Sequence, residues 1–199
     1  MSRDFILSYG SLLSRQSRVD YSAITADVYP ALVSGWKRGW CVRHLEELTT
    51  HAGAIRDNGS TMHCVLVPTE LNDDIREREK YYDFVEVERS DVEFPEGVPD
   101  AAAEGKFWIC QPKAIQFPDS DFPLSQSYVD TCLIGCIETG ISDWPVGFIL
   151  ATAGWEHCWV DDRNYETPIY VRAAVLSAAE QERVDDFLDE AGVLEHRRK

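Results

Sequence analysis

The sequence predicts an α+β protein in which a mixed, barrel-like sheet is flanked by helices. Extended patterns rich in Val, Tyr and Trp dominate the first half of the chain, whereas apolar residues at helical spacing dominate the last third. The 199 residues are 44% hydrophobic, which is ample for a core, and neither a repeat nor a linker divides them. We therefore expect a single domain over residues 1–199, with residues 142–199 as a helical C-terminal elaboration of it.

Several extended runs have the composition of strands. Two of them are joined by Asn58-Gly59, a dipeptide typical of a hairpin turn, and Ser34-Gly35 should break one long run into a bent strand pair. In chain order the predicted strands cover residues 5–9, 28–42, 53–55, 62–67, 82–88, 107–110 and 169–175. Because most of them precede residue 110, we expect the early strands to curl into a barrel.

Helical patterns occupy the rest of the chain. Ser127 and Asp130 have the spacing of a capping box, as do Ser177 and Glu180, and Gly192 should end the last helix. The predicted helices are a short charged one over residues 69–79 and three more over residues 127–137, 143–153 and 178–191. Residues 90–105 are predicted to be a surface excursion, because they combine acidic residues with prolines and an alanine run.

The charge of the chain excludes one class of partner. With 19 Lys and Arg against 35 Asp and Glu, the net charge is −16. A surface this negative repels phosphate backbones, so no nucleic-acid partner is expected. No segment approaches the roughly 18 apolar residues that span a bilayer, and the N-terminal residues lack a secretory pattern. We expect a cytoplasmic protein with no membrane partner, whose oligomeric state the sequence leaves undetermined.

Six cysteines could in number form three disulfides, but a cytosolic chain of this length does not need them. Cys132 and Cys136 are four residues apart on a predicted helix, which suits a buried face. The best metal pattern is Cys41-x-x-His44 with His63-Cys64, and it lacks the paired C-x-x-C knuckles of a structural zinc site. We therefore expect reduced core cysteines and no metal.

Tyr9-Gly10-Ser11-Leu12 is the first candidate site. A Gly-Ser turn at a strand end, followed by a helical turn, points successive backbone N–H groups into one concavity. Such a nest can bind a carboxylate, a phosphate or a developing oxyanion. The alternative is that Gly-Ser serves only the geometry of the turn.

Glu79 is the second candidate. It ends a charged run and comes just before Tyr81 and Tyr82. Charged runs are usually solvated helix faces, and Glu77 is expected to lie on such a face. A carboxylate flanked by tyrosines and partly shielded from water would instead suit a general base.

The motifs of other enzyme classes are absent from the sequence. There is no Gly-x-Ser-x-Gly, no Walker loop, no Gly-x-Gly-x-x-Gly and no His-Glu-x-x-His. His63-Cys64 and His157-Cys158 are adjacent pairs, whose side chains would point to opposite faces of a strand. A nucleophilic Cys–His pair formed from other positions stays open.

Taken together, these segments resemble the gamma-glutamylcyclotransferase-like family. Residues 5–12 resemble the family's hydrophobic strand followed by YGS and Leu, and residues 78–87 resemble its Arg-Glu-x-Tyr segment. Weaker matches follow at residues 33–38, at residues 64–68, with Cys64 in place of a small residue, and at residues 127–130, which lack a preceding Pro. The resemblance spans residues 4 to about 140 and leaves out residues 142–199.

The resemblance implies a cyclotransferase of glutathione metabolism that converts a γ-glutamyl amino acid or related γ-glutamyl compound into 5-oxoproline and a free amine. It implies no metal and no cofactor, and its partner is the small-molecule γ-glutamyl substrate. Glu79 would be the general acid/base. The substrate-binding residues would be Tyr9, Gly10, Ser11 and Leu12, which hold the carboxylate or oxyanion, and Tyr128, which orients the glutamyl group.

Two other functions stay open at this point. The protein could be a non-catalytic member of the same fold that binds a small ligand, or an enzyme specific for γ-glutamyl amines. The net charge of −16 disfavours an anionic substrate, but local N–H donors and a nearby Arg can outweigh it, because distant charges are screened beyond a Debye length of about 8 Å in physiological salt. Arg15, Arg38 and Arg78 are the candidates for that cation.

Overall fold

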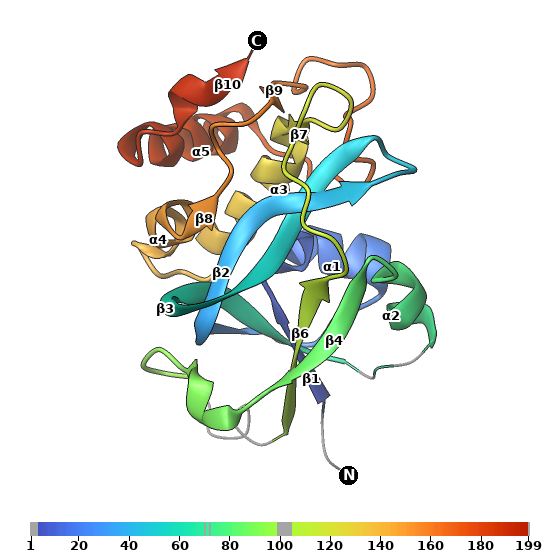
Figure 1. The fold of residues 1–199 in the computed structure, drawn as a ribbon. Coiled ribbons are helices and arrows are strands. Elements are labelled where there is room, and N and C mark those ends of the chain that lie inside the picture. Colours follow the sequence, from blue (N-terminus) through green and yellow to red (C-terminus); the bar gives the residue numbers. More distant parts are fainter. Residues whose placement is uncertain (1–3, 70, 72, 99–104, 199) are drawn as a thin grey trace.

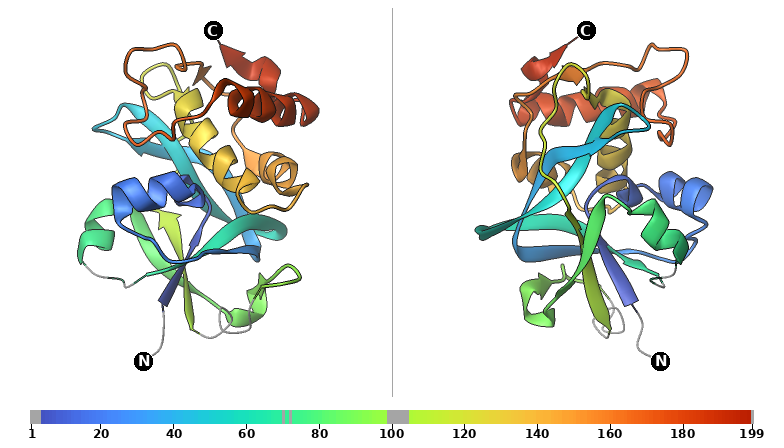
Figure 2. Two further views of the ribbon diagram at one scale, coloured as in Figure 1. Left: turned by 180° about the vertical axis from the view of Figure 1, so that it is seen from behind. Right: turned by 45° about the vertical axis from the view of Figure 1, so that its right-hand side comes forward.

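A computed structural model of the protein describes residues 4–69, 71, 73–98 and 105–198. Within these residues, seven strands form the main sheet in the order β4-β6-β1-β3-β2-β5, with β8 paired to β2, and three more form a small sheet in the order β10-β9-β7. A long β2–β3 hairpin crosses the molecule, with the two termini at opposite ends (Figure 1). Helices α3, α4 and α5 gather toward the C-terminal end (Figure 2). The predicted α+β class, with a curled sheet and flanking helices, is confirmed.

The secondary structure covers most of the described chain. The strands are β1 (Asp4–Ser8), β2 (Tyr29–His44), β3 (Thr49–Pro68), β4 (Tyr82–Val87), β5 (Val92–Glu93), β6 (Lys106–Pro112), β7 (Leu124–Ser125), β8 (Thr152–Ala153), β9 (Trp159–Val160) and β10 (Arg197–Arg198). The helices are η1 (Ser11–Leu13), α1 (Arg15–Ser22), α2 (Asp73–Arg78), η2 (Arg89–Asp91), α3 (Gln126–Ile137), α4 (Trp144–Leu150), α5 (Ala178–Glu190) and η4 (Leu194–His196).

The hairpin predicted at Asn58-Gly59 is wrong. The strands on both sides of it are parts of β3 and pair with the same long strand β2, whose register shifts between Ser34 and Trp36. The residues between Arg56 and Thr61 form a bulge opposite Gly35, which has a positive φ of 80°. The predicted strand pair over residues 28–42 is therefore one bent strand. The bulge adds the local twist that curls the sheet.

Two predictions about the C-terminal half are also wrong. Residues 169–175 form no strand, since their amides bond to side chains of α3 and to Asp162 instead of to a sheet. Ser127 is not the N-cap of α3, because the helix begins after Ser125. The Ser127 hydroxyl and amide both donate to Asp162, at 2.6 and 2.8 Å. The Asp162 carboxylate, distant in sequence, thus accepts hydrogen bonds from donors in the first turn of this helix.

The predicted helices near residues 80 and 190 agree better with the structure. The capping box of Ser177 and Glu180 is present, and Gly192 follows α5 with a φ of 71°. The charged segment contains the short helix α2, although residues 70 and 72 lie outside the described residues. The predicted surface excursion over residues 90–105 includes η2 and β5, and residues 99–104 of it also lie outside.

Arg38 joins the end of β1 to the rest of the core. Its guanidinium is fully buried, and its Nε donates to the Tyr9 carbonyl at 2.8 Å. Nη1 donates to the Phe148 carbonyl at 3.2 Å and to Thr152 Oγ1 at 3.1 Å, and Nη2 donates to the His63 carbonyl. The guanidinium also stacks on the Phe148 ring at 3.6 Å. Arg38 therefore fixes the chain at the point where β1 becomes the Gly-Ser turn.

Helix α3 holds the same turn from the other side. A Cβ atom added to Gly135 would lie 2.2 Å from the carbonyl carbon of Leu13 and 2.4 Å from the amide nitrogen of Ser14. Only glycine therefore allows α3 to approach the backbone of η1 this closely. The turn after β1 is positioned by two buried contacts, one from Arg38 and one from Gly135.

We predict that Arg38→Met destabilises the fold by about 3 kcal/mol or more, because it leaves buried carbonyl groups without a donor. Urea unfolding followed by tryptophan fluorescence measures this change. Lys37→Met, the neighbouring residue of β2, is the matched control and should change the unfolding free energy by less than about 0.5 kcal/mol. Equal stability of the two variants would show that Arg38 does not tie the core together.

Candidate active site

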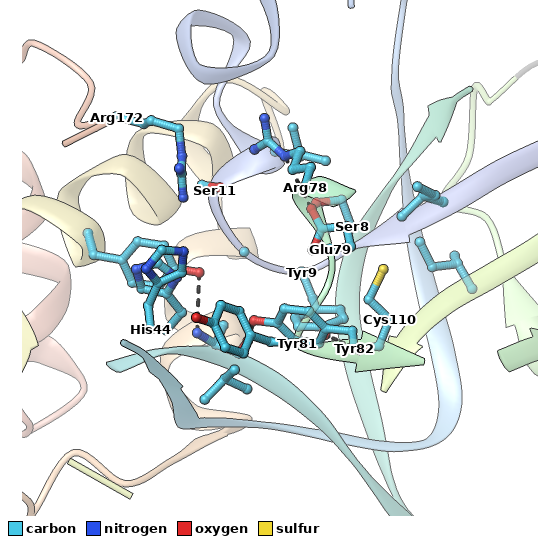
Figure 3. A pocket seen from close by; sticks show the side chains of 18 residues that line it. Ser8, Tyr9, Ser11, His44, Arg78, Glu79, Tyr81, Tyr82, Cys110 and Arg172 are labelled. Atoms are coloured by element: carbon cyan, nitrogen blue, oxygen red, sulfur yellow. Dashed lines mark hydrogen bonds and ion pairs between the residues drawn. The ribbon is translucent and has the colours of Figure 1, made fainter. Parts of the chain in front are cut away.

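One pocket of the described residues collects every site residue that the sequence predicted. It lies where β1 ends, and its lining includes Tyr9, Gly10, Ser11, Leu12, Glu79 and Tyr128. These residues come from β1 and η1, from the turn after α2 and from α3, which lie far apart in the sequence (Figure 3). The sheet order contributes to this, because β1 lies between β6 and β3, and β4 pairs with β6 next to it.

The loop after β1 lines the pocket and carries backbone donors that have no acceptor in its own short helix. Leu13 N–H bonds to the Gly10 carbonyl at 2.9 Å and closes the short helix η1. The amides of Ser11 and Leu12 are the first two of this helix, so they have no acceptor within it. A Cβ atom on Gly10 would lie 2.8 Å from the Tyr128 hydroxyl oxygen, so the loop and the phenol touch only because residue 10 is glycine.

The phenol of Tyr128 is buried beside this loop. Its oxygen accepts from the Ala52 amide at 3.2 Å, and the hydroxyl also forms a hydrogen bond with the Cys132 side chain one turn along α3. Burial raises the pKa of Tyr128 well above its ordinary value, so the phenol stays protonated at neutral pH. The ring stacks on His51 at 4.6 Å and meets Tyr170 edge-on at 4.8 Å. Tyr128 can therefore present a hydrogen-bond donor at a fixed position.

Glu79 lies in the turn between α2 and β4. Its amide bonds to the Ile75 carbonyl at 3.0 Å, and its carbonyl accepts from the Tyr82 amide at 2.9 Å. The carboxylate is 18% exposed, and its Oε1 lies 3.2 Å from Nε of Arg78. The Glu77 side chain is 80% exposed and points to solvent, 3.8 Å from Nζ of Lys80. The two carboxylates of the charged run are thus in different environments.

Tyrosines form the base of the pocket below Glu79. The Tyr9 hydroxyl donates to the Cys110 carbonyl, and the Tyr82 hydroxyl donates to the Ala52 carbonyl at 2.8 Å. Burial, and then the nearby Glu79 charge among other causes, raises the pKa of both phenols well above the ordinary value. Both phenols therefore stay protonated at neutral pH, and their protons are already donated to backbone carbonyls. The base of the pocket is polar, and its hydroxyl groups are held in fixed positions.

Five further polar residues that the sequence did not assign to the site also line the pocket: Ser8, His44, His51, Cys110 and Arg172. Burial lowers the pKa of both histidines below the ordinary value, so both are neutral at pH 7. Arg172 follows a segment without a motif, so no local signal could have identified it. The sequence indicates His44 only as part of a possible zinc pattern, and His51 belongs to no motif.

The three candidate arginines lie in different places relative to the pocket. Arg78 lines the pocket beside Glu79, and it also donates to the Ser22 hydroxyl and the Tyr21 carbonyl. Arg38 lies in the core behind the loop and donates to Tyr9, so it supports the pocket without lining it. Arg15 is exposed and lies outside the lining.

The described residues contain no group of three His, Cys, Asp or Glu side chains that could hold a metal ion. All six cysteines are free, and burial raises the pKa of the Cys41 and Cys64 thiols to about 12. These thiols are therefore protonated at neutral pH and poor nucleophiles. None of the helices in the described ranges is long and apolar enough to cross a membrane.

The fold has counterparts among solved structures. A gamma-glutamyl cyclotransferase structure superposes with a TM-score of 0.56 and 14% identity, over 92% of this chain and 98% of that one. An uncharacterized protein from Homo sapiens gives 0.56 and 13%, over 92% and 99%. YkqA from Bacillus subtilis gives 0.51 and 17%, over 73% and 52%. No protein-family model and no curated protein sequence matches the chain significantly.

The first two matches extend past the region where the sequence motifs lie. Residues 1–141 are 141 of the 199 residues, so a coverage of 92% must include residues after position 141. At identities of 13–14% the similarity concerns the arrangement of the chain in space. The protein has the gamma-glutamyl cyclotransferase-like fold.

Proposed function

We propose that this protein is a cyclotransferase that converts a γ-glutamyl compound into 5-oxoproline and a free amine. The observation that carries the proposal is that Glu79 and the Gly10–Leu12 loop line one pocket, together with Tyr128. Each of these features is ordinary alone and becomes chemically useful in combination. The fold shared with a gamma-glutamyl cyclotransferase structure supports the same reaction.

The proposed reaction is an intramolecular transfer. The α-amine nitrogen of the substrate attacks its own γ-carbonyl carbon, which forms the five-membered ring. The amide bond to the departing nitrogen then breaks. One proton leaves the attacking amine and one is added to the departing amine, so the enzyme is unchanged and no water is consumed. Because the nucleophile is already tethered, the protein contributes mainly by holding the substrate bent.

Four of the six predicted site residues, together with Arg78, have a role in this reaction. Glu79 accepts the proton of the attacking amine and returns it to the departing nitrogen. The amides of Ser11 and Leu12 bind the carboxylate or the developing oxyanion, where preorganised donors are most effective. The phenol of Tyr128 donates to an oxygen of the glutamyl group. Arg78 orients the Glu79 carboxylate through its contact with Oε1, and this contact leaves Oε2 for the substrate.

The overall charge of −16 does not oppose an anionic substrate. Arg78 and Arg172 both line the pocket, and charges farther away than about 8 Å are largely screened in physiological salt. Six free cysteines also suit the reducing cytoplasm, where we place the reaction.

Glu79→Gln should lower turnover by about two to four orders of magnitude, because Gln keeps the size and polarity of the side chain but cannot accept a proton. Release of 5-oxoproline from a panel of γ-glutamyl amino acids and γ-glutamyl amines measures this effect. Substrate binding by the variant, followed by calorimetry, should persist.

Glu77→Gln is the matched control, because Glu77 belongs to the same charged run but points to solvent. It should keep the activity of the original protein, and melting curves should show both variants folded. Equal activity of the two variants would refute the role of Glu79. Binding of γ-glutamyl compounds without any release of 5-oxoproline by the unaltered protein would favour the non-catalytic alternative.

Activity should also survive EDTA and the replacement Cys110→Ala. The proposed nucleophile belongs to the substrate, and the Cys110 thiol stays protonated because burial raises its pKa well above the ordinary value. The measurement is 5-oxoproline release before and after dialysis against the chelator, and with the purified variant. Loss of activity in the first case would indicate a metal-dependent mechanism. Loss in the second, with folding intact, would indicate thiol chemistry.

A further inference from the structure

Arg172 reaches the predicted pocket from a part of the chain that carries no recognisable motif. It lines the pocket together with Ser11 and Leu12, and its side chain is 28% exposed. In Figure 3 the Arg172 side chain lies on one side of Ser11, with Arg78 and Glu79 on the other. The segment after residue 142 therefore supplies a cation to a pocket whose other lining residues lie between Ile6 and Tyr128.

The position of Arg172 is fixed by the backbone of its own segment. Ile169 N–H donates to Asp162 Oδ2 at 2.7 Å, and Tyr170 N–H donates to the Ser127 hydroxyl at 3.2 Å. Ala174 N–H donates to Thr131 Oγ1 at 2.9 Å. These three bonds attach the residues before and after Arg172 to α3 and to Asp162, whose side chains are buried. The guanidinium is therefore preorganised rather than carried on a free loop.

The hydrogen bonds of Arg172 connect it to the loop after β1. Its Nε donates to the Tyr170 hydroxyl at 3.3 Å, and that hydroxyl also interacts with the Ser11 side chain. Its Nη1 lies 3.1 Å from Oε1 of Glu47. Within the described part of the chain, Nη2 has no partner, so one edge of the guanidinium remains available. Arg172 lines the same pocket as Ser11 and Leu12.

We propose that Arg172 binds the α-carboxylate of the γ-glutamyl group, jointly with the Ser11 and Leu12 amides. This inference rests on the proposed function, since it assigns a substrate group to one wall of the same pocket. Arg78 donates through Nε to Glu79 and through Nη1 to Ser22, so it is committed to the proposed base. Arg172 is instead connected to Ser11 through the Tyr170 hydroxyl, which makes it the lining cation on the carboxylate side of the pocket. A carboxylate held by two amides and a guanidinium places the adjacent α-amine toward Glu79 on the other side of Ser11.

The test uses three compounds that differ in one group each. γ-Glutamyl-alanine has both carboxylates, γ-glutamyl-alaninamide lacks the one on the departing amine, and 4-aminobutyryl-alanine lacks the α-carboxylate. Arg172→Gln should lower kcat/KM for the first two equally, by about 10- to 100-fold and mainly through KM. It should leave the poor turnover of the third unchanged. Arg172→Lys should recover part of the loss, because Lys keeps the positive charge but cannot donate two parallel hydrogen bonds to a carboxylate.

Two controls separate substrate binding from a structural role. Glu47→Gln removes the ion pair but leaves the guanidinium, so KM should stay the same or fall; a rise equal to that of Arg172→Gln would show that the pair only supports the fold. Arg183→Gln removes an exposed arginine of α5 and should change nothing. A loss confined to γ-glutamyl-alanine would mean that Arg172 binds the carboxylate carried by the departing amine. That result would overturn the inference.

The failure of this inference differs from the failure of the proposed function. If none of the compounds releases its cyclic product from the unaltered protein, the proposed function fails. Binding measured by calorimetry then tests the role of Arg172 independently of turnover. γ-Glutamyl-alanine should bind the Glu79→Gln variant at least about 10-fold more tightly than the variant that also carries Arg172→Gln. Equal affinities, or no binding to either variant, would overturn the role of Arg172.

Discussion

The position of the candidate site depends on a buried arginine that has no carboxylate partner among the described residues. Arg38 gives its donors to one hydroxyl and to carbonyl groups from the end of β1, from β3 and from α4, so a single guanidinium joins three parts of the chain. Removing an unpaired cation from water is costly and must be offset by good geometry and full hydrogen bonding. The gain is a loop whose Tyr9 carbonyl is held by the buried Arg38 while residues 10–12 line the pocket.

Helix α3 positions the other parts of the site. Its Gly135 allows contact with η1, its Tyr128 touches Gly10, and its Ser127 and Thr131 accept the backbone of residues 170–174. The same helix therefore places the loop, a phenol and Arg172 around one cavity. Asp162 links this arrangement to the C-terminal half, because it takes both donors of Ser127 and the amide of Ile169.

Local patterns predicted the parts of the site that are encoded locally. The Gly-Ser turn follows a strand because of its own backbone preferences, and Glu79 differs from Glu77 because aromatic residues follow it. Features that depend on distant partners could not be predicted in this way. Asn58-Gly59 became a bulge because β2 is long enough to pair on both sides of it. Residues 169–175 have the composition of a strand but bond to α3, and Arg172 lines the pocket only through that long-range contact.

The central claim is that one cavity holds a bent γ-glutamyl group between the Ser11 and Leu12 amides and Glu79. A crystal structure of the Glu79→Gln variant with γ-glutamyl-alanine tests it most directly, because that variant should bind the compound without consuming it. We expect the α-carboxylate at the Ser11 and Leu12 amides, and the α-amine about 3 Å from the side chain of residue 79. A ligand bound outside this pocket, or one whose amine faces away from residue 79, would contradict the account.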